Sequence, residues 1–357
     1  MADAISIVRS ALVVMLVGCA AQPTDPTPSS ALSASATSAP TSTATFALSG
    51  PSASPTGAPA LSFEVSTYPV PAGSHPHDVA PAADGGVWYT AQATGRLGWL
   101  DPETGDVREI PLGPGSAPHG VITGPDGAAW VTDSGLNAMV RVDAGDRVTV
   151  YPLDVPDANL NTAAFDGDGV LWFTGQNGIY GSLDPGSGAL TVFTAPRLTG
   201  PYGIAATAAG EVFFGSLAGS YLGAIDRATG QVDVIDTPTP GGGARRVWPD
   251  AAGRLWVTEW FTGSLAMYDP AVETWTEWTV PGGNPMPYAV YVDELDAVWI
   301  TDFGSNAILR FDPVTEEWLS FEHESQPAEV RQLLGREGEI WGAESAADQL
   351  VVVRTAE

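Results

Sequence analysis

The chain has 357 residues, enough for one large domain or two, and its 42 Asp and Glu against 14 Lys and Arg give a formal net charge of −28 at pH 7. This balance excludes a nucleic-acid partner, because phosphates need a basic face. The basic side chains other than His are all Arg, which excludes lysine nucleophiles, and the single cysteine excludes internal disulfides.

The first 19 residues have the features of a bacterial lipoprotein signal peptide. Arg9 precedes an apolar run over residues 11–17, and Leu-Val-Gly-Cys at 16–19 resembles a lipobox. We expect acyl chains on Cys19, which would anchor an exported protein to the bacterial cell membrane or envelope. The alternatives are a signal peptide that is cleaved elsewhere and an ordinary core cysteine.

Residues 20–61 are rich in Ala, Ser, Thr and Pro. Such a segment buries too little apolar surface to offset its chain entropy. The composition predicts a disordered tether between the lipid anchor and the folded domain.

From residue 62 to residue 357 an aromatic marker recurs every 41–43 residues, each time within a short apolar run. The markers are Trp88, Trp130, Trp172, Phe213, Trp256, Trp299 and Trp341. This period, with four strand-like runs in each unit, is typical of a β-propeller blade. The sequence therefore predicts an all-β, seven-bladed propeller, with the aromatic markers packed between blades. We expect it to be a monomer.

The second repeat shows the predicted blade most clearly. Strand-like runs cover 119–122, 129–132, 138–142 and 147–153, and Pro-Asp-Gly at 125–127 forms the first turn. The last repeat ends after its third strand, at 349–353. Residues 63–69 match the missing outer strand, so we expect this N-terminal strand to pair beside 349–353 and close the ring.

Two positions in each repeat are expected to face a central funnel. The first ring, eleven residues before each marker, contains His77, His119, Asn161, Tyr202, Arg245, Tyr288 and Val330. The second ring, three residues after each marker, contains Ala91, Asp133, Gly175, Ser216, Glu259, Asp302 and Glu344.

Histidines occupy first-ring positions in two adjacent blades, and Pro precedes both. We expect His77 and His119 to be catalytic, because one imidazole can act as a general base near neutral pH. Four carboxylates of the second ring are candidate ligands for Mg²⁺, or alternatively Ca²⁺, which prefer oxygen donors. These ligands are Asp133, Glu259, Asp302 and Glu344. The alternative is that each carboxylate accepts backbone N–H bonds in the turn that follows its strand.

Other polar residues of the funnel are candidates for substrate binding. They are Asn161, Tyr202, Arg245, Arg246, Tyr288 and Arg331. The three arginines could hold a carboxylate or phosphate. Alternatively, Arg245 and Arg246 pair with Glu259 or Asp302. His75 and His323 are expected in a loop and at the surface.

Several repeat motifs resemble those of the virginiamycin B lyase (streptogramin B lyase) family. They are Ala-Pro-His-Gly-Val at 117–121, Tyr-Pro-Leu at 151–153, Leu-Trp-Phe-Thr at 171–174, Gly-Pro-Tyr-Gly-Ile at 200–204 and Leu-Trp-Val-Thr-Glu-Trp at 255–260. The resemblance implies a C–O lyase that linearises a cyclic depsipeptide antibiotic by elimination and so confers antibiotic resistance. It also implies Mg²⁺ that polarises the ester, a histidine that removes the proton α to the carbonyl, and catalytic histidines in Pro-His motifs on adjacent blades, which correspond to His77 and His119.

Three functions follow as hypotheses. The first is an exported, metal-assisted C–O lyase that opens an ester, lactone or cyclic depsipeptide with a His base. The second is a non-catalytic envelope propeller that binds a small anionic ligand or a protein. The absence of the family's functional Glu residues favours it, since their places hold His75 and Ala117, and Gln92 and Ser134. The third is a Ca²⁺-dependent hydrolase of the gluconolactonase type.

Overall fold

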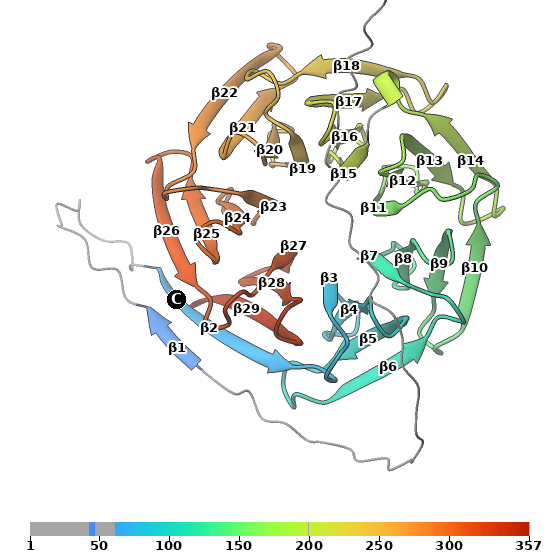
Figure 1. The fold of residues 1–357 in the computed structure, drawn as a ribbon, viewed down its shortest axis with the longest axis horizontal. Helices are drawn as coiled ribbons and strands as arrows, with labels where there is room; N and C mark the ends of the chain where they lie inside the picture. Colours follow the sequence, from blue (N-terminus) through green and yellow to red (C-terminus); the bar gives the residue numbers. More distant parts are fainter. Residues whose placement is uncertain (1–42, 47–60, 199, 357) are drawn as a thin grey trace, which may run out of the picture. The chain divides into compact units, whose positions relative to one another are not determined.

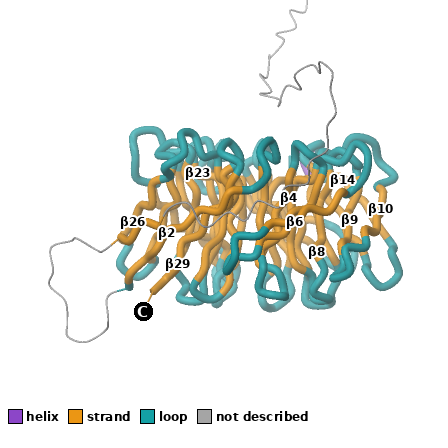
Figure 2. The backbone as a smooth tube through the Cα atoms, turned by 90° about the horizontal axis from the view of Figure 1, so that it is seen from below, coloured by secondary structure: helices purple, strands orange, loops and turns teal. Residues whose placement is uncertain are grey.

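The computed structural model describes residues 43–46, 61–198 and 200–356, which form a β-propeller of seven blades around a central opening (Figure 1). Six blades are antiparallel sheets of four strands that follow chain order, with the first strand innermost. Seen from the side, the strands stand between two layers of loops (Figure 2). Within the described residues, no helix is long and apolar enough to cross a membrane.

The strands of the first three blades have these bounds. The first blade contains β3 (Pro76–Pro81), β4 (Val87–Ala91), β5 (Arg96–Leu100) and β6 (Val107–Pro111). The second contains β7 (Pro118–Thr123), β8 (Ala129–Asp133), β9 (Ala138–Val142) and β10 (Val148–Pro152). The third contains β11 (Leu160–Phe165), β12 (Leu171–Gly175), β13 (Ile179–Leu183) and β14 (Leu190–Thr194). A short 3₁₀ turn, η1 (Pro196–Leu198), follows.

The next three blades repeat this pattern. The fourth contains β15 (Pro201–Ala206), β16 (Val212–Ser216), β17 (Tyr221–Ile225) and β18 (Val232–Asp236). The fifth contains β19 (Ala244–Pro249), β20 (Leu255–Glu259), β21 (Ser264–Asp269) and β22 (Thr274–Thr279). The sixth contains β23 (Pro287–Val292), β24 (Val298–Asp302), β25 (Ala307–Asp312) and β26 (Glu317–Glu322).

The two ends of the propeller sequence share the seventh blade. It contains β27 (Val330–Arg336), β28 (Glu339–Glu344) and β29 (Gln349–Ala356), completed by β2 (Ser62–Pro69). β2 and β29 are antiparallel over their whole length, from the Ser62–Ala356 pair to the Pro69–Gln349 pair. The predicted closure by the N-terminal strand is therefore confirmed.

A further strand, β1 (Thr43–Phe46), pairs with the outer edge of β2. It lies within residues 20–61, where composition predicts a tether without structure. β-branched Thr alternates here with Ala and Phe, and β2 offers unpaired backbone groups on its outer edge, which together favour strand addition. The predicted signal peptide and Cys19 lie outside the described residues.

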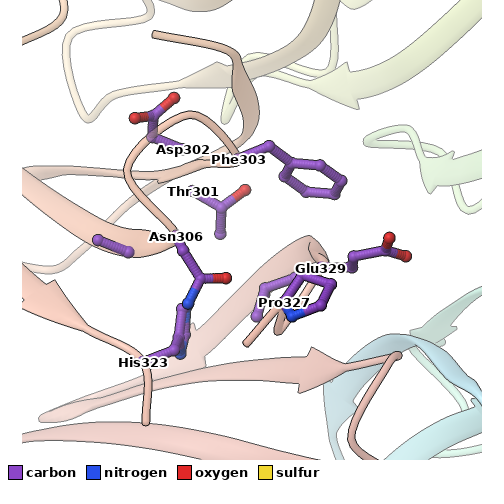
Figure 3. Close-up of a pocket in the computed structure, with 9 residues that line it drawn as sticks. Thr301, Asp302, Phe303, Asn306, His323, Pro327 and Glu329 are labelled. Carbon is purple, nitrogen blue, oxygen red and sulfur yellow. The ribbon is translucent and has the colours of Figure 1, made fainter. Parts of the chain in front are cut away.

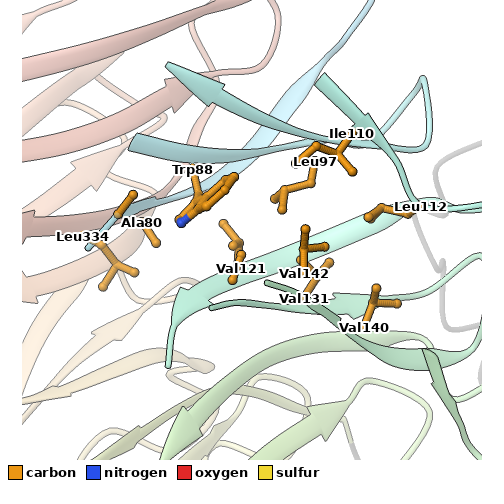
Figure 4. Packing of buried hydrophobic residues seen from close by; sticks show 12 residues of the cluster. Ala80, Trp88, Leu97, Ile110, Leu112, Val121, Val131, Val140, Val142 and Leu334 are labelled. Atoms are coloured by element: carbon orange, nitrogen blue, oxygen red, sulfur yellow. The ribbon is translucent and has the colours of Figure 1, made fainter. Parts of the chain in front are cut away.

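The aromatic markers form the core between blades, as expected. Trp88, for example, is 3% exposed and belongs to an apolar cluster that includes Ala80 of its own blade, Val121 of the second blade and Leu334 of the seventh (Figure 4). Packing of each blade against the next fixes the inner strands around the central opening.

Candidate functional site

Threonines of the second strands hold neighbouring inner strands together. The N–H of Asp78 donates to Thr90 Oγ1 at 3.0 Å, and this hydroxyl donates to the backbone carbonyl of His119, on the next blade, at 2.8 Å. Thr132 Oγ1 makes the equivalent bond to the Asn161 carbonyl at 2.6 Å. A shift in register interrupts the pairing of every inner strand at this point. In five of the seven blades a Thr hydroxyl occupies the bulge and so helps to hold the first ring in place, whereas Gly215 and Ala343 stand at this position in the fourth and seventh blades.

The first ring has one member that differs from the expectation. Pro76, just before His77, pairs with Ala91, and in the seventh blade Val330 takes the place of Pro76 by pairing with Glu344. Arg331 is therefore the ring residue, whereas Val330 is buried in the apolar core. The cause is a turn between β27 and β28 that is one residue shorter than its counterparts. The position eleven residues before Trp341 is therefore Val330, whereas the residue equivalent to His77 is Arg331.

His77 and His119 lie side by side among the inner-strand residues around the central opening, a set that we call the central channel and that includes Asp78, Arg245 and Arg246. Their ring centroids are 3.9 Å apart, and 6% of each residue is exposed. His119 Nδ1 is 3.0 Å from the backbone oxygen of Asn161, which can only accept, so Nδ1 carries the proton. His77 Nδ1 is 2.7 Å from Asp78 Oδ1, and a carboxylate there selects the same tautomer. In both rings Nε2 keeps its lone pair.

The two imidazoles are neutral at pH 7. Burial holds the pKa of His77 well below its usual value, and the positive charges of Arg331, Arg246 and Arg245 add to this effect. Burial also lowers the pKa of His119, as does the neighbouring His77. The first two blades therefore present two adjacent nitrogen bases.

Asp78 is a site residue that the sequence analysis did not identify. It is fully buried, and its Oδ2 is 3.6 Å from Nη2 of Arg246, so that β3 and β19 are linked across the channel. Burial raises the pKa of the Asp78 carboxyl, and Arg246 opposes that rise. The available signal was an acidic residue inside an inner strand, directly after His77 and before the apolar pair Val79 and Ala80.

Arginine and aromatic residues form the opposite side of the site. The Arg245 guanidinium lies 3.5 Å from the ring centroid of Tyr288 and 4.1 Å from that of Trp260. Its Nη2 donates to the Tyr202 hydroxyl at 3.0 Å, and the hydroxyls of Tyr202 and Tyr288 are 2.5 Å apart. Burial and the neighbouring Tyr202 raise the pKa of Tyr288 to about 12. Among the described residues Arg245 forms no ion pair with a carboxylate, so the expected alternative pairing with Glu259 or Asp302 is not found.

Two of the four proposed metal ligands hold loops of their own blades. Asp133 Oδ1 accepts the N–H groups of Ala117 and Leu136, both at 2.9 Å. Asp302 accepts the N–H groups of Met286 at 2.5 Å and Ser305 at 2.8 Å. Both carboxylates therefore match the alternative prediction, in which an acidic residue at the end of a strand accepts backbone N–H bonds from nearby turns.

The other two proposed ligands also have partners outside the channel. Glu344 accepts from His323 Nδ1 at 2.8 Å and from Gln349 Nε2 at 2.6 Å. His323 is thus buried, not at the surface as expected, and it lines a small pocket with Asp302 and Glu329 (Figure 3).

Glu259 is the fourth proposed ligand. It accepts from Thr262 Oγ1 at 3.1 Å. Burial and the adjacent Glu277 raise the pKa of Glu259 to about 8, so this group is an acid, not a carboxylate, at neutral pH. A protonated carboxyl is a poor ligand for a divalent ion.

A different group has the donor atoms for a metal ion: His77, Asp78 and His119 place one ligand atom each within 4.8 Å of one another. The described residues bring none of the four proposed carboxylates into this group. Mg²⁺ and Ca²⁺ prefer six or more oxygen ligands. Here two donors are nitrogen, and the single carboxylate already binds His77 and faces Arg246. The donor set does not fit Mg²⁺ or Ca²⁺, and its nitrogen content suits a transition metal better.

Comparison with solved structures places this fold beside known lyases. A streptogramin B lyase structure superposes with a TM-score of 0.77 at 21% identity, covering 82% of this chain and 98% of that chain. A catalytically inactive virginiamycin B lyase from Staphylococcus aureus with quinupristin gives 0.76 at 20%, covering 82% and 99%. An extracellular domain from a two-component system of B. thetaiotaomicron gives 0.64 at 16%, covering 80% and 39%. A search of curated proteins found no match.

The sequence itself carries the family assignment. The model of the virginiamycin B lyase family matches residues 56–281, which is more than half of the chain. The matched region includes the blades that carry His77, His119 and Arg246. The chain therefore belongs to the virginiamycin B lyase family.

Proposed function

We propose that this protein opens an ester or lactone by elimination, with His77 as the base. The observation that supports this most is the pair of neutral imidazoles whose Nδ1 atoms are both engaged, so that both Nε2 atoms can accept a proton. His77 is the better base of the two, because Asp78 stabilises the imidazolium that forms, whereas His119 has only a neutral carbonyl behind it.

The reaction needs no water. His77 Nε2 removes the proton from the carbon α to a carbonyl, and the C–H electron pair forms a double bond to the neighbouring carbon. The C–O bond to that neighbour breaks, and the leaving oxygen takes its electron pair as a carboxylate. Charge develops on the substrate carbonyl in the transition state, and the nearby guanidinium of Arg246 is placed to stabilise it. No step is assigned to Mg²⁺ or Ca²⁺, since the donor set fits neither.

The substrate we propose is a small-molecule ester, lactone or cyclic depsipeptide. The shared fold of the virginiamycin B lyase that was solved with quinupristin supports this proposal. The decisive experiment incubates the protein, without residues 1–61, with a streptogramin B or a simple lactone whose ring oxygen is the leaving group and lies β to a carbonyl. Elimination gives a product of unchanged mass, whereas hydrolysis adds one water.

We expect His77→Ala to lower turnover by roughly 10²–10⁴, with His119→Ala also impaired through its contact with His77. Glu103→Ala is the control, because Glu103 is an exposed turn residue of the first blade. EDTA provides a second arm: a rate that EDTA leaves unchanged supports elimination without a metal, whereas a rate that EDTA abolishes would show that an ion held by His77, Asp78 and His119 takes part. A product that is one water heavier would favour the gluconolactonase-type hydrolase, and no product from any such substrate would favour the non-catalytic propeller.

We also propose that the protein is exported and anchored by lipid at Cys19. The lipobox motif supports this, and so does the fold shared with a bacterial domain described as extracellular. Cys19→Ala should move the full-length protein from the membrane fraction to the soluble fraction. Unchanged membrane association would contradict the anchor.

A further inference from the structure

The central channel contains buried hydrogen-bond donors that nothing in the described part of the chain satisfies. Arg246 is only 4% exposed, and its Nε and Nη1 have no hydrogen-bond partner there. The same holds for Nε of Arg245 and Nδ2 of Asn161, and for one acceptor, Oδ2 of Asp78, which lies 3.6 Å from Arg246 Nη2. Buried donors are nearly always paired in folded proteins, so several of them around one channel indicate a ligand that accepts hydrogen bonds.

The charges around these donors select an anion. Three guanidinium groups face two carboxylates, since Arg246 lies near Asp78 and Arg331 binds Glu329 at 2.5 Å. Both histidines are neutral. One positive charge, on Arg245, is therefore left over, although the chain as a whole carries −28. A local excess of positive charge on such an acidic protein attracts an anion to this place.

The environment of Arg245 also favours binding of an anion to its guanidinium group. Aromatic faces of Tyr288 and Trp260 cover part of the guanidinium, but they cannot accept its N–H groups as strong hydrogen bonds. A planar guanidinium with free N–H groups matches a carboxylate in geometry.

We infer that this site binds a substrate with a free carboxylate, which Arg245 holds while Arg246 faces the reacting carbonyl and the reacting carbon faces the two histidines. The choice of substrate rests on the proposed function, but binding itself does not. The ligand class is an ester or lactone of a carboxylic acid that keeps one carboxylate free.

Binding is tested with probes that differ only in charge. Succinate and succinamide are titrated calorimetrically into the full-length protein in detergent, at constant ionic strength and with EDTA present. Wild type should bind succinate at least tenfold more tightly than succinamide, because hydrogen bonds between charged groups are the stronger kind. Equal binding of both probes, or binding of neither, would overturn the inference.

Variants locate the site. Arg245→Gln should weaken succinate binding about tenfold or more, and it is the safer probe because Arg245 has no ion-pair partner to leave behind. Arg246→Lys keeps the charge opposite Asp78 but loses the planar guanidinium, and should weaken binding as well. Arg96→Gln, an exposed arginine of the first blade, is the matched control. Succinate binding that is unaffected by both channel variants would overturn the assignment.

The outcomes separate this inference from the proposed function. Charge-selective binding without any elimination product would contradict the proposed lyase activity and support the carboxylate site. Elimination of neutral esters without charge-selective binding would support the proposed lyase activity and contradict the carboxylate site.

Discussion

Asp78→Asn tests the histidine tautomer on which the proposed mechanism depends. In the native site the Asp78 carboxylate can only accept, which holds the proton on His77 Nδ1, 2.7 Å away. An asparagine of the same size can turn its amide N–H toward Nδ1 and move the ring proton to Nε2, where it blocks the base. We therefore expect turnover to fall by roughly 10²–10⁴.

The same substitution has a stability cost that can be bounded. Removing one partner of a buried ion pair costs about 3–5 kcal/mol. Here the closest Asp78–Arg246 approach is 3.6 Å, and burial already raises the pKa of the carboxyl, so its charged form is poorly stabilised. We expect a loss toward the lower end of that range.

Three measurements check this prediction. Urea unfolding gives the stability loss, turnover gives the rate, and ¹⁵N NMR of the imidazole nitrogens reports which nitrogen of His77 carries the proton. Asp106→Asn, at an exposed position, is the control. If His77 stays protonated on Nδ1 in the variant and turnover changes by less than about twofold, the tautomer argument is wrong.

Two further predictions concern stability. Glu259 has a folded-state pKa near 8, above its unfolded value, so its burial destabilises the fold as pH rises from about 4.5 to 8. Glu259→Gln should gain stability over wild type by at most about 1.4 kcal/mol per pH unit in that window, measured by unfolding at pH 5 and pH 8, with no pH-dependent gain for exposed Glu317→Gln. Phe63 is 3% exposed and packs on Phe321 at 5.3 Å, so Phe63→Ala should cost about 3–5 kcal/mol in urea unfolding. Leu61→Ala, at the exposed residue directly before this strand, should cost far less, and equal costs would contradict closure through β2.

The sequence by itself determined the architecture, because a repeated unit reports its own structure. The spacing of the aromatic markers predicted seven blades, and the missing outer strand of the last repeat predicted the pairing of β2 with β29. It also placed His77 and His119 at equivalent points of adjacent blades. These inferences depend only on local periodicity, which every blade repeats.

The tertiary structure alone decided which polar groups meet. Asp78 and Arg246 are distant in sequence, on the first and fifth blades, and only ring closure brings them to 3.6 Å. The carboxylate of Asp133 shares the periodic position expected to face the funnel, yet its side chain binds nearby backbone. Periodicity assigns a residue to a face, but the direction and partners of its side chain depend on contacts between blades. One shortened turn likewise replaced Val330 by Arg331 in the first ring, because strand pairing and not a count of residues sets the register.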